Sequence, residues 1–200
     1  MTTLYVLGDS VPHGERTSDT GWPDRLGGVR AVEQHGGMGV SLTSLSERAT
    51  AGDLTLHGSV AEDEGRETET EATVLVHAGH NDAQLSGGEP RVPETTFRDA
   101  AADLDAFLDA DARVDRHAFV GLVPLLRLDR PGSIPFDESQ PDRSLAYDDA
   151  LAAVVATHLP VARPVDEWLG WTEDGVHPND AGHAFIAERV EAWLAGERAE

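Results

Sequence analysis

A short apolar run near the start of the chain stops abruptly at a glycine and two polar residues. The run Leu4-Tyr5-Val6-Leu7 shows no polar alternation, and Gly8-Asp9-Ser10 follows it directly. Such a run is typical of a strand buried on both faces, as in the centre of a parallel sheet. Ligands of open α/β sheets bind just beyond the carboxyl ends of the strands, so Ser10 is a candidate site residue. Taken alone, the tripeptide fits an ordinary capped turn equally well.

Further apolar runs alternate with segments of helical spacing along the whole chain. The runs predict strands over residues 29–33, 73–77, 118–123 and 161–165. Helical spacing or caps predict helices over residues 22–26, 41–49, 94–109 and 143–158, and a last helix after Asn179 or Asp180. Trp168 and Trp171 are expected in a loop. This alternation predicts an α/β fold with a mainly parallel, five-stranded sheet covered by helices on both faces.

Length and composition favour one domain over residues 1–200. The 200 residues are 40% hydrophobic, which suits a single α/β core. There is no cysteine, which excludes disulfides and thiolate metal sites. We see no secretory signal and no apolar run of membrane-spanning length, so we expect a cytoplasmic protein without a membrane partner.

The charge balance is strongly acidic. Asp and Glu number 37 against 15 basic residues, all of them Arg, and the formal net charge is −22. This charge would repel nucleic acid, so we expect no nucleic-acid partner. The acidic residues are spread along the chain, and together with the absence of Lys they suggest adaptation to concentrated salt in a halophilic organism. The alternative is an ordinary acidic protein with a solvated surface.

Four polar clusters carry the residue types of nucleophilic catalysis. A serine nucleophile needs a base within hydrogen-bond reach and a third group that orients the base. Asp174 and His177 could supply that carboxylate and imidazole to Ser10. A tetrahedral oxyanion needs preorganised donors, which the Ser10 N–H, the Gly39 N–H and the Asn81 amide could provide.

The four clusters together resemble the sequence blocks of the SGNH hydrolases, also called the GDSL esterase/lipase family. Gly8-Asp9-Ser10 resembles the nucleophile block, and Gly36 to Ser41 resembles the second block. Gly79-His80-Asn81-Asp82 resembles the G-x-N-D block. Asp174-Gly175-Val176-His177-Pro178-Asn179 resembles the D-G-x-H-P-N block closely. The resemblance spans nearly the whole chain, in the order of the family.

The resemblance implies a flavodoxin-like, three-layer α/β/α fold and hydrolysis of esters or thioesters with neither metal nor other cofactor. It implies that Ser10 is the nucleophile, His177 the base and Asp174 its orienting group, with Ser10, Gly39 and Asn81 as oxyanion donors. Two departures stand out: Gln34 replaces the usual Asn of the second block, and Val11-Pro12 follows the nucleophile. Another register of the second block would place Leu42 at the oxyanion position instead of Gly39.

Other functions remain open from the sequence. The same site could serve an acyltransferase or a lysophospholipase. A metal-dependent phosphoesterase would use His77, His80, Asp82, Asp174 and His177 as ligands. A binding module without catalysis is the third class.

The expected partner is a small-molecule ester with a short acyl group. Residues 125–142 contain several prolines and are a candidate lid over the site. Their charged side chains are expected to border a small, open pocket: Arg127, Asp129, Arg130, Asp137, Glu138 and Asp142.

Overall fold

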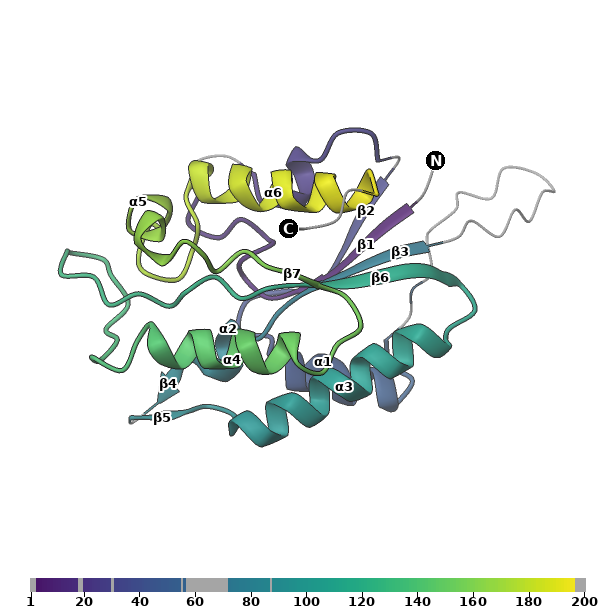
Figure 1. The fold of residues 1–200 in the computed structure, drawn as a ribbon, viewed down its shortest axis with the longest axis horizontal. Helices are drawn as coiled ribbons and strands as arrows, with labels where there is room; N and C mark the ends of the chain where they lie inside the picture. The colour runs from purple at the N-terminus through teal and green to yellow at the C-terminus, as the bar shows by residue number, and fades with distance from the viewer. Residues whose placement is uncertain are drawn as a thin grey trace.

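The centre of the protein is a sheet of five parallel strands (Figure 1). The computed structural model describes residues 3–17, 20–29, 31–54, 56, 72–86 and 88–196. The strands lie in the order β2 (Ala31–Gly36), β1 (Thr3–Gly8), β3 (Ala72–His77), β6 (Val114–Val120) and β7 (His158–Leu159). Counted along the chain, this order is 2-1-3-4-5, that of flavodoxin-like folds. The predicted parallel, five-stranded sheet is confirmed.

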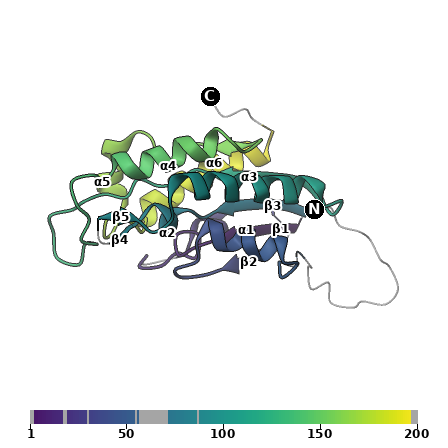
Figure 2. The same cartoon turned by 90° about the horizontal axis from the view of Figure 1, so that it is seen from below.

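Helices cover both faces of the sheet, so the central strands are buried on both sides. On one face, Leu4 and Val6 pack with residues of η1 (Trp22–Arg25), α5 (Trp168–Trp171) and α6 (Asp180–Leu194). On the other, Tyr5 and Leu7 pack with α1 (Leu42–Thr50), α3 (Glu94–Ala110) and α4 (Asp142–Ala152). Figure 2 shows α1 and α3 side by side on this second face. The three-layer α/β/α prediction is confirmed, and burial on both faces explains why β1 lacks alternation.

Local capping explains where two helices begin. Ser41 and Ser44 form a reciprocal capping box at the start of α1. The Asn179 side chain accepts hydrogen bonds from the Ala181 and Gly182 N–H groups at the start of α6. The predicted helices over 41–49, 94–109 and after Asn179 are confirmed as α1, α3 and α6. The smaller elements are α2 (His80–Ala83), β4 (Leu85–Ser86), β5 (Glu89–Pro90) and η2 (Val165–Glu167).

The last strand and the helix before it differ from the prediction. The prediction of a strand over residues 161–165 is wrong, because the last strand, β7, is His158–Leu159 and residues 165–167 form η2. Pro160 comes directly before the expected segment and Pro164 lies within it, and proline cannot donate to a strand ladder. The helix expected to reach residue 158 ends at Ala152. The chain must turn there, because the Thr157 carbonyl accepts the Phe119 N–H at 2.9 Å.

Three smaller expectations also need correction. The strand expected over 118–123 spans Val114–Val120, because the Leu122 and Val123 N–H groups donate to side chains instead. The second strand begins at Ala31 rather than at residue 29. The two tryptophans expected in a loop start and end the short helix α5.

In the parts of the chain that the structure describes, no helix is both long and apolar enough to cross a membrane.

Candidate active site

The predicted site residues gather beyond the carboxyl ends of β1, β2 and β3. Ser10 follows β1, Gly39 lies between β2 and α1, and Asn81 lies in α2 just after β3. His177 comes from the loop between α5 and α6. All of these residues line one cavity of about 180 Å³. Its lining among the described residues consists of Ser10, Met38, Gly39, His80, Asn81, Gln84, Leu125, Ile134, Val176 and His177.

Ser10, His177 and Asp174 form a continuous hydrogen-bonded chain. The Ser10 Oγ lies 3.0 Å from Nε2 of His177, and Nδ1 of His177 lies 2.9 Å from Oδ2 of Asp174. Because an ionised carboxylate only accepts, we assign the ring proton to Nδ1, which leaves Nε2 free to accept the serine proton. This is the arrangement that a serine nucleophile requires.

Asp174 is held in its ionised form by its own loop. Its Oδ1 accepts the backbone N–H groups of Val176 and His177, each at 2.9 Å. Burial opposes ionisation, but hydrogen bonds from the ring and backbone of His177 lower the pKa of Asp174 to about 2. Arg16, which the sequence analysis did not single out, also donates to Oδ2 of Asp174, at 2.6 Å. The carboxylate is therefore charged at neutral pH.

The three expected oxyanion donors face the same cavity. Among the described residues, the N–H groups of Ser10 and Gly39 have no acceptor within the protein. Gly39 has φ +77°, a conformation that favours glycine. The Asn81 Nδ2 donates one hydrogen to the Val40 carbonyl at 3.0 Å, which leaves its second hydrogen for a ligand.

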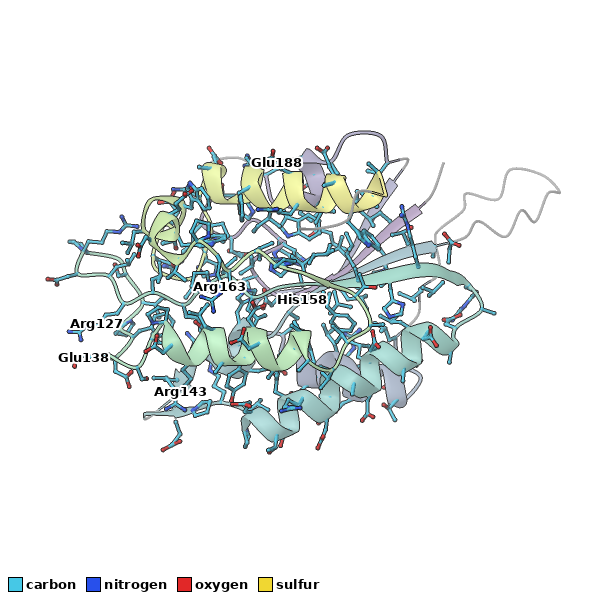
Figure 3. All side chains as sticks on the ribbon, viewed as in Figure 1. Arg127, Glu138, Arg143, His158, Arg163 and Glu188 are labelled. Atoms are coloured by element: carbon cyan, nitrogen blue, oxygen red, sulfur yellow. The ribbon has the colours of Figure 1, made fainter. Side chains whose placement is uncertain are left out.

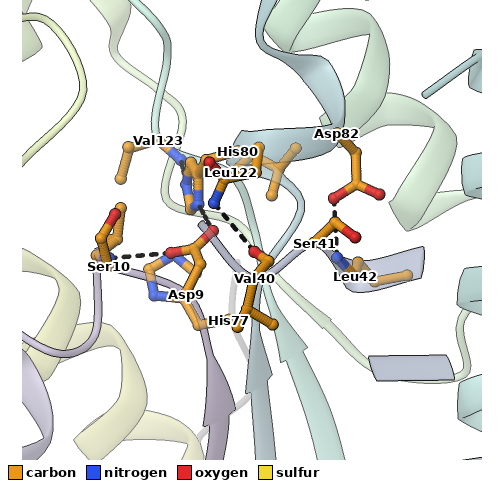
Figure 4. A network of polar contacts seen from close by, with 12 residues as sticks. Asp9, Ser10, Val40, Ser41, Leu42, His77, His80, Asp82, Leu122 and Val123 are labelled. Carbon is orange, nitrogen blue, oxygen red and sulfur yellow. Dashed lines mark hydrogen bonds and ion pairs between the residues drawn. The ribbon is translucent and has the colours of Figure 1, made fainter. Parts of the chain in front are cut away.

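The alternative register at Leu42 does not fit this geometry. The Leu42 N–H donates to Oδ2 of Asp82 at 2.8 Å, and the Leu42 side chain is fully buried (Figure 4). Asp82 also accepts the Thr43 N–H and hydroxyl, so it caps α1. Leu42 is not among the residues that line the cavity, whereas Gly39 is.

The buried pair of Asp9 and His80, next to Ser10, connects the carboxyl ends of β1, β3 and β6. Asp9 accepts the Val11 N–H at 2.9 Å and the His80 Nδ1–H at 2.8 Å (Figure 4). His80 Nε2 accepts the Val123 N–H at 3.0 Å, so His80 is the neutral Nδ1–H tautomer. Burial raises the pKa of Asp9, but the contacts with His80 and Val11 outweigh it and lower this pKa overall. The network fixes the backbone on both sides of Ser10.

The side chains considered as metal ligands do not converge. His77 Nδ1 accepts the Trp22 indole N–H at 3.0 Å, while His80 and Asp82 have the partners given above. Asp174 and His177 bind each other. Within the described ranges, no group of three or more His, Asp or Glu side chains is arranged to hold a metal ion.

Residues 125–136, which we call the brace, bind the loop that carries Asp174 and His177. The Leu126 N–H donates to the Gly175 carbonyl at 2.7 Å, and the Ile134 N–H donates to the Asp174 carbonyl at 2.8 Å. Arg130 donates to the carbonyls of Thr172 and Glu173. The brace presents Leu125 and Ile134 to the cavity. The charged side chains expected to border the pocket are not among the lining residues, so that expectation is wrong: Arg127, Asp129, Arg130, Asp137, Glu138 and Asp142 all lie outside the lining.

Comparison with solved structures finds chains with a similar fold. In the solved structures, similar chains include LAE5, an alpha/beta hydrolase enzyme from the metagenome of Lake Arreo in Spain. It is 18% identical with a TM-score of 0.66, covering 99% of this chain and 97% of that one. A member of the lipolytic protein G-D-S-L family from Veillonella parvula is 14% identical with a TM-score of 0.60, covering 97% of each chain. The psychrotrophic esterase EstA from Pseudoalteromonas is 15% identical with a TM-score of 0.60, covering 98% and 100%.

These identities are low, so the solved structures support the fold alone. A search of curated proteins found no match. The family model described as GDSL-like Lipase/Acylhydrolase matches residues 6–185, from within β1 into α6. The matched region includes every residue of the hydrogen-bonded chain and every expected oxyanion donor. Because the match covers most of the sequence, the chain belongs to the GDSL-like lipase/acylhydrolase family.

Proposed function

We propose that this protein is a serine hydrolase that cleaves carboxylic esters through an acyl-enzyme. The observation that carries the proposal is the hydrogen-bonded chain from the Ser10 hydroxyl through His177 to Asp174. Membership of an acylhydrolase family agrees with it. Thioesters fit the same chemistry, because attack occurs at the same carbonyl carbon.

The geometry supports a two-step reaction. His177 Nε2 takes the hydroxyl proton while Ser10 Oγ bonds to the carbonyl carbon, and the oxyanion forms among the Ser10 N–H, Gly39 N–H and Asn81 amide. The intermediate collapses as the bond to the leaving alcohol breaks, and His177 returns the proton to that alcohol. Water then attacks the acyl carbon while His177 Nε2 takes the proton of the water. The bond between the acyl carbon and Ser10 Oγ breaks, His177 gives the proton to Ser10 Oγ, and the acid is released. Asp174 stays ionised and stabilises the imidazolium in both steps.

The cavity favours a short acyl group, of roughly two to eight carbons, because each methylene contributes about 0.8 kcal/mol only where a lining takes it out of water. Its volume is about 180 Å³. Met38, Leu125, Ile134 and Val176 supply its apolar lining. A long acyl chain would extend beyond this lining into solvent and gain little.

The direct test is hydrolysis of a p-nitrophenyl ester series from acetate to palmitate in molar salt. We expect kcat/KM to reach a plateau at short chains and then to fall. Ser10→Ala and His177→Ala should each abolish hydrolysis while the fold is kept, because nucleophile and base act as a unit. Near-normal turnover by folded Ser10→Ala would overturn the serine mechanism.

The same assay separates the other functions that the sequence left open. A continuous rise of kcat/KM through the long chains would indicate a lysophospholipase or lipase. Transfer to an added alcohol in preference to water would indicate an acyltransferase. Loss of activity on exhaustive chelation, restored by a divalent ion, would indicate the phosphoesterase. Cytoplasmic location and origin from a halophilic organism stay predictions.

A further inference from the structure

Asp174 receives one hydrogen bond from outside its own loop. Arg16 Nη1 lies 2.6 Å from Oδ2, the same oxygen that accepts the His177 ring N–H. Oδ1 is occupied by the backbone N–H groups of Val176 and His177. A carboxylate offers about four lone-pair sites, so Arg16 fills the last of them. The Asp174 side chain is 3% exposed and that of Arg16 is 52% exposed, so the guanidinium lies between the buried carboxylate and solvent.

The backbone of Arg16 is strained. Its φ is +61°, and among the described residues it is the only residue other than glycine with a positive φ. A side chain disfavours this conformation, which persists only where surrounding contacts enforce it. The loop that leaves Ser10 is compact, because the Gly14 N–H donates to the Val11 carbonyl and the Glu15 N–H to the Ser10 carbonyl. This path turns the chain back, so that Arg16 meets Asp174.

We propose that Arg16 is a positioning residue for catalysis, which ties the nucleophile loop to the carboxylate that orients His177. The inference rests on the proposed hydrolase function. It gives Arg16 two effects. The first is alignment, because a displacement of about 1 Å within a catalytic group can cost about a hundredfold in rate. The second is electrostatic, because Arg16 draws part of the Asp174 charge away from His177.

The second effect predicts a change in the pH dependence. The charged and titratable groups around the His177–Asp174 pair are Arg16 from the nucleophile loop, His80 from α2, Arg130 from the brace and His183 from α6. Both arginines carry a permanent positive charge, but Arg130 binds the backbone carbonyls of Thr172 and Glu173. Among the described residues, the arginine that contacts the Asp174 carboxylate itself is Arg16. Removal of the Arg16 charge stabilises the imidazolium, so the acid limb of kcat/KM should move to higher pH, by up to about one unit.

The experiment compares Arg16→Gln, Arg16→Lys and Arg16→Gly with the wild-type protein. We measure kcat/KM on a short p-nitrophenyl ester from pH 5 to 9 at fixed salt, together with Tm. Arg16→Gln and Arg16→Gly should lower the plateau value of kcat/KM by about tenfold to a hundredfold. Arg16→Lys should keep most of the wild-type value, because the contact with Asp174 uses a single nitrogen. Gly relieves the backbone strain, so its Tm should not fall. Because the position is half exposed, millimolar guanidinium should restore part of the activity of Arg16→Gly.

Arg113→Gln is the matched control. The Arg113 side chain is 50% exposed and pairs with Asp111 at 2.6 Å. Arg113 comes directly before β6, whose first residues lie at the opposite end of the sheet from Arg127 and Glu138 (Figure 3), and it does not line the cavity. Its removal should leave the rate and the acid limb unchanged. Wild-type behaviour of Arg16→Gln and Arg16→Gly would overturn the inference. Loss of activity with a lower Tm, an unmoved acid limb and no rescue would also overturn it, because the role would then be structural.

An NMR titration of the His177 ring separates this inference from the proposed function, since it needs no substrate. In Arg16→Gln, the His177 midpoint should rise relative to wild type. An unmoved midpoint would overturn the inference even in an active esterase. A wild-type protein without esterase activity would count against the proposed function, while the titration would still decide the role of Arg16.

Discussion

At the scale of single residues, the amide of Asn81 is held in place by two contacts. Its Nδ2 donates to the Val40 carbonyl, and its Oδ1 accepts from Arg91 at 3.3 Å. Asn81→Ala should lower kcat by about a hundredfold to a thousandfold with little change in KM, as expected for one oxyanion donor. Steady-state kinetics on a short ester measures both constants. A loss confined to KM would assign Asn81 to ground-state binding instead.

Gly39 can be tested against a neighbouring glycine. Gly39 and Gly37 have φ +77° and +144°, and a Cβ on either meets nothing within 4 Å. A valine strains the loop at both positions, but only Gly39 lines the cavity. We therefore expect Gly39→Val to abolish hydrolysis and Gly37→Val to keep a measurable part of it. Equal losses would assign the effect to loop strain, and a harmless Gly39→Val would favour the Leu42 register.

The sequence predicted the residues that this site brings together, because their types suit the chemistry and their sequence blocks resemble those of a known family. It did not predict Arg16, since one arginine in a polar turn carries no local pattern that points to Asp174. The sequence offered no role for His80 except that of a metal ligand in the phosphoesterase alternative. The bond of His80 to Asp9 depends on the register of β1 against β3, where Gly8 pairs with His77. Contacts of this kind are set by tertiary packing.

At the scale of elements, the brace depends on a close approach to Gly175. A Cβ there would lie 2.1 Å from the Leu126 carbonyl oxygen, and its φ is +97°. Gly175→Ala should therefore displace the brace, lower stability by about 1–3 kcal/mol and reduce kcat. Gly132→Ala is the control, because Gly132 has φ +85° but a Cβ there meets nothing within 4 Å. Urea unfolding and ester kinetics on both variants give the comparison, and equal effects would contradict this role of Gly175.

The elements that the sequence placed well are those whose signal is local. Repeated apolar positions and a capping asparagine suffice for α3 and α6. The edge of the sheet was misplaced, because apolar residues are buried there without forming a strand. Val161 is fully buried between two prolines. The Leu122 N–H donates to the carboxylate of Asp148 rather than to a strand. Hydropathy reports burial in such segments but not the partner of each backbone N–H.

At the scale of the whole molecule, two buried histidines make the fold sensitive to acid. Burial lowers the pKa of His77 to about 3 and that of His183 to about 4, against 6.5 in the unfolded chain. The unfolded chain therefore binds protons below pH 6.5 that the folded protein does not. Their contribution to stability is complete above pH 6.5 and declines as the pH falls towards 4.

This decline can be measured between pH 7.5 and 5, where most carboxylates do not yet titrate. The free energy of unfolding in urea should drop over this range by a few kcal/mol. His183→Leu removes one of the two titrating groups and should therefore reduce the slope of the unfolding free energy against pH. The substitution breaks no hydrogen bond of the ring, because neither ring nitrogen of His183 has a partner among the described residues. A stability that is flat with pH, or a slope unchanged in this variant, would contradict the assignment.

The net charge of −22 predicts that the fold depends on salt. The Debye length falls from about 30 Å at 0.01 M salt to about 3 Å at 1 M, so self-repulsion should weaken sharply. We expect Tm to rise steeply with KCl between these limits. NaCl at equal ionic strength should act in the same way if screening is the cause. A Tm that is insensitive to both salts would remove the argument for adaptation to concentrated salt.

The Ser10 hydroxyl and the His177 imidazole, which would activate it in the proposed mechanism, are separated by 167 positions along the chain. During translation at about 5–20 residues per second, the base follows the nucleophile by on the order of ten seconds or more. A nascent chain that has exposed β1 but not the loop before α6 has a serine without a proton acceptor. In the proposed mechanism, hydrolytic capacity would therefore arise only when the carboxyl-terminal segment docks, and incomplete translation products should be inert towards cellular esters.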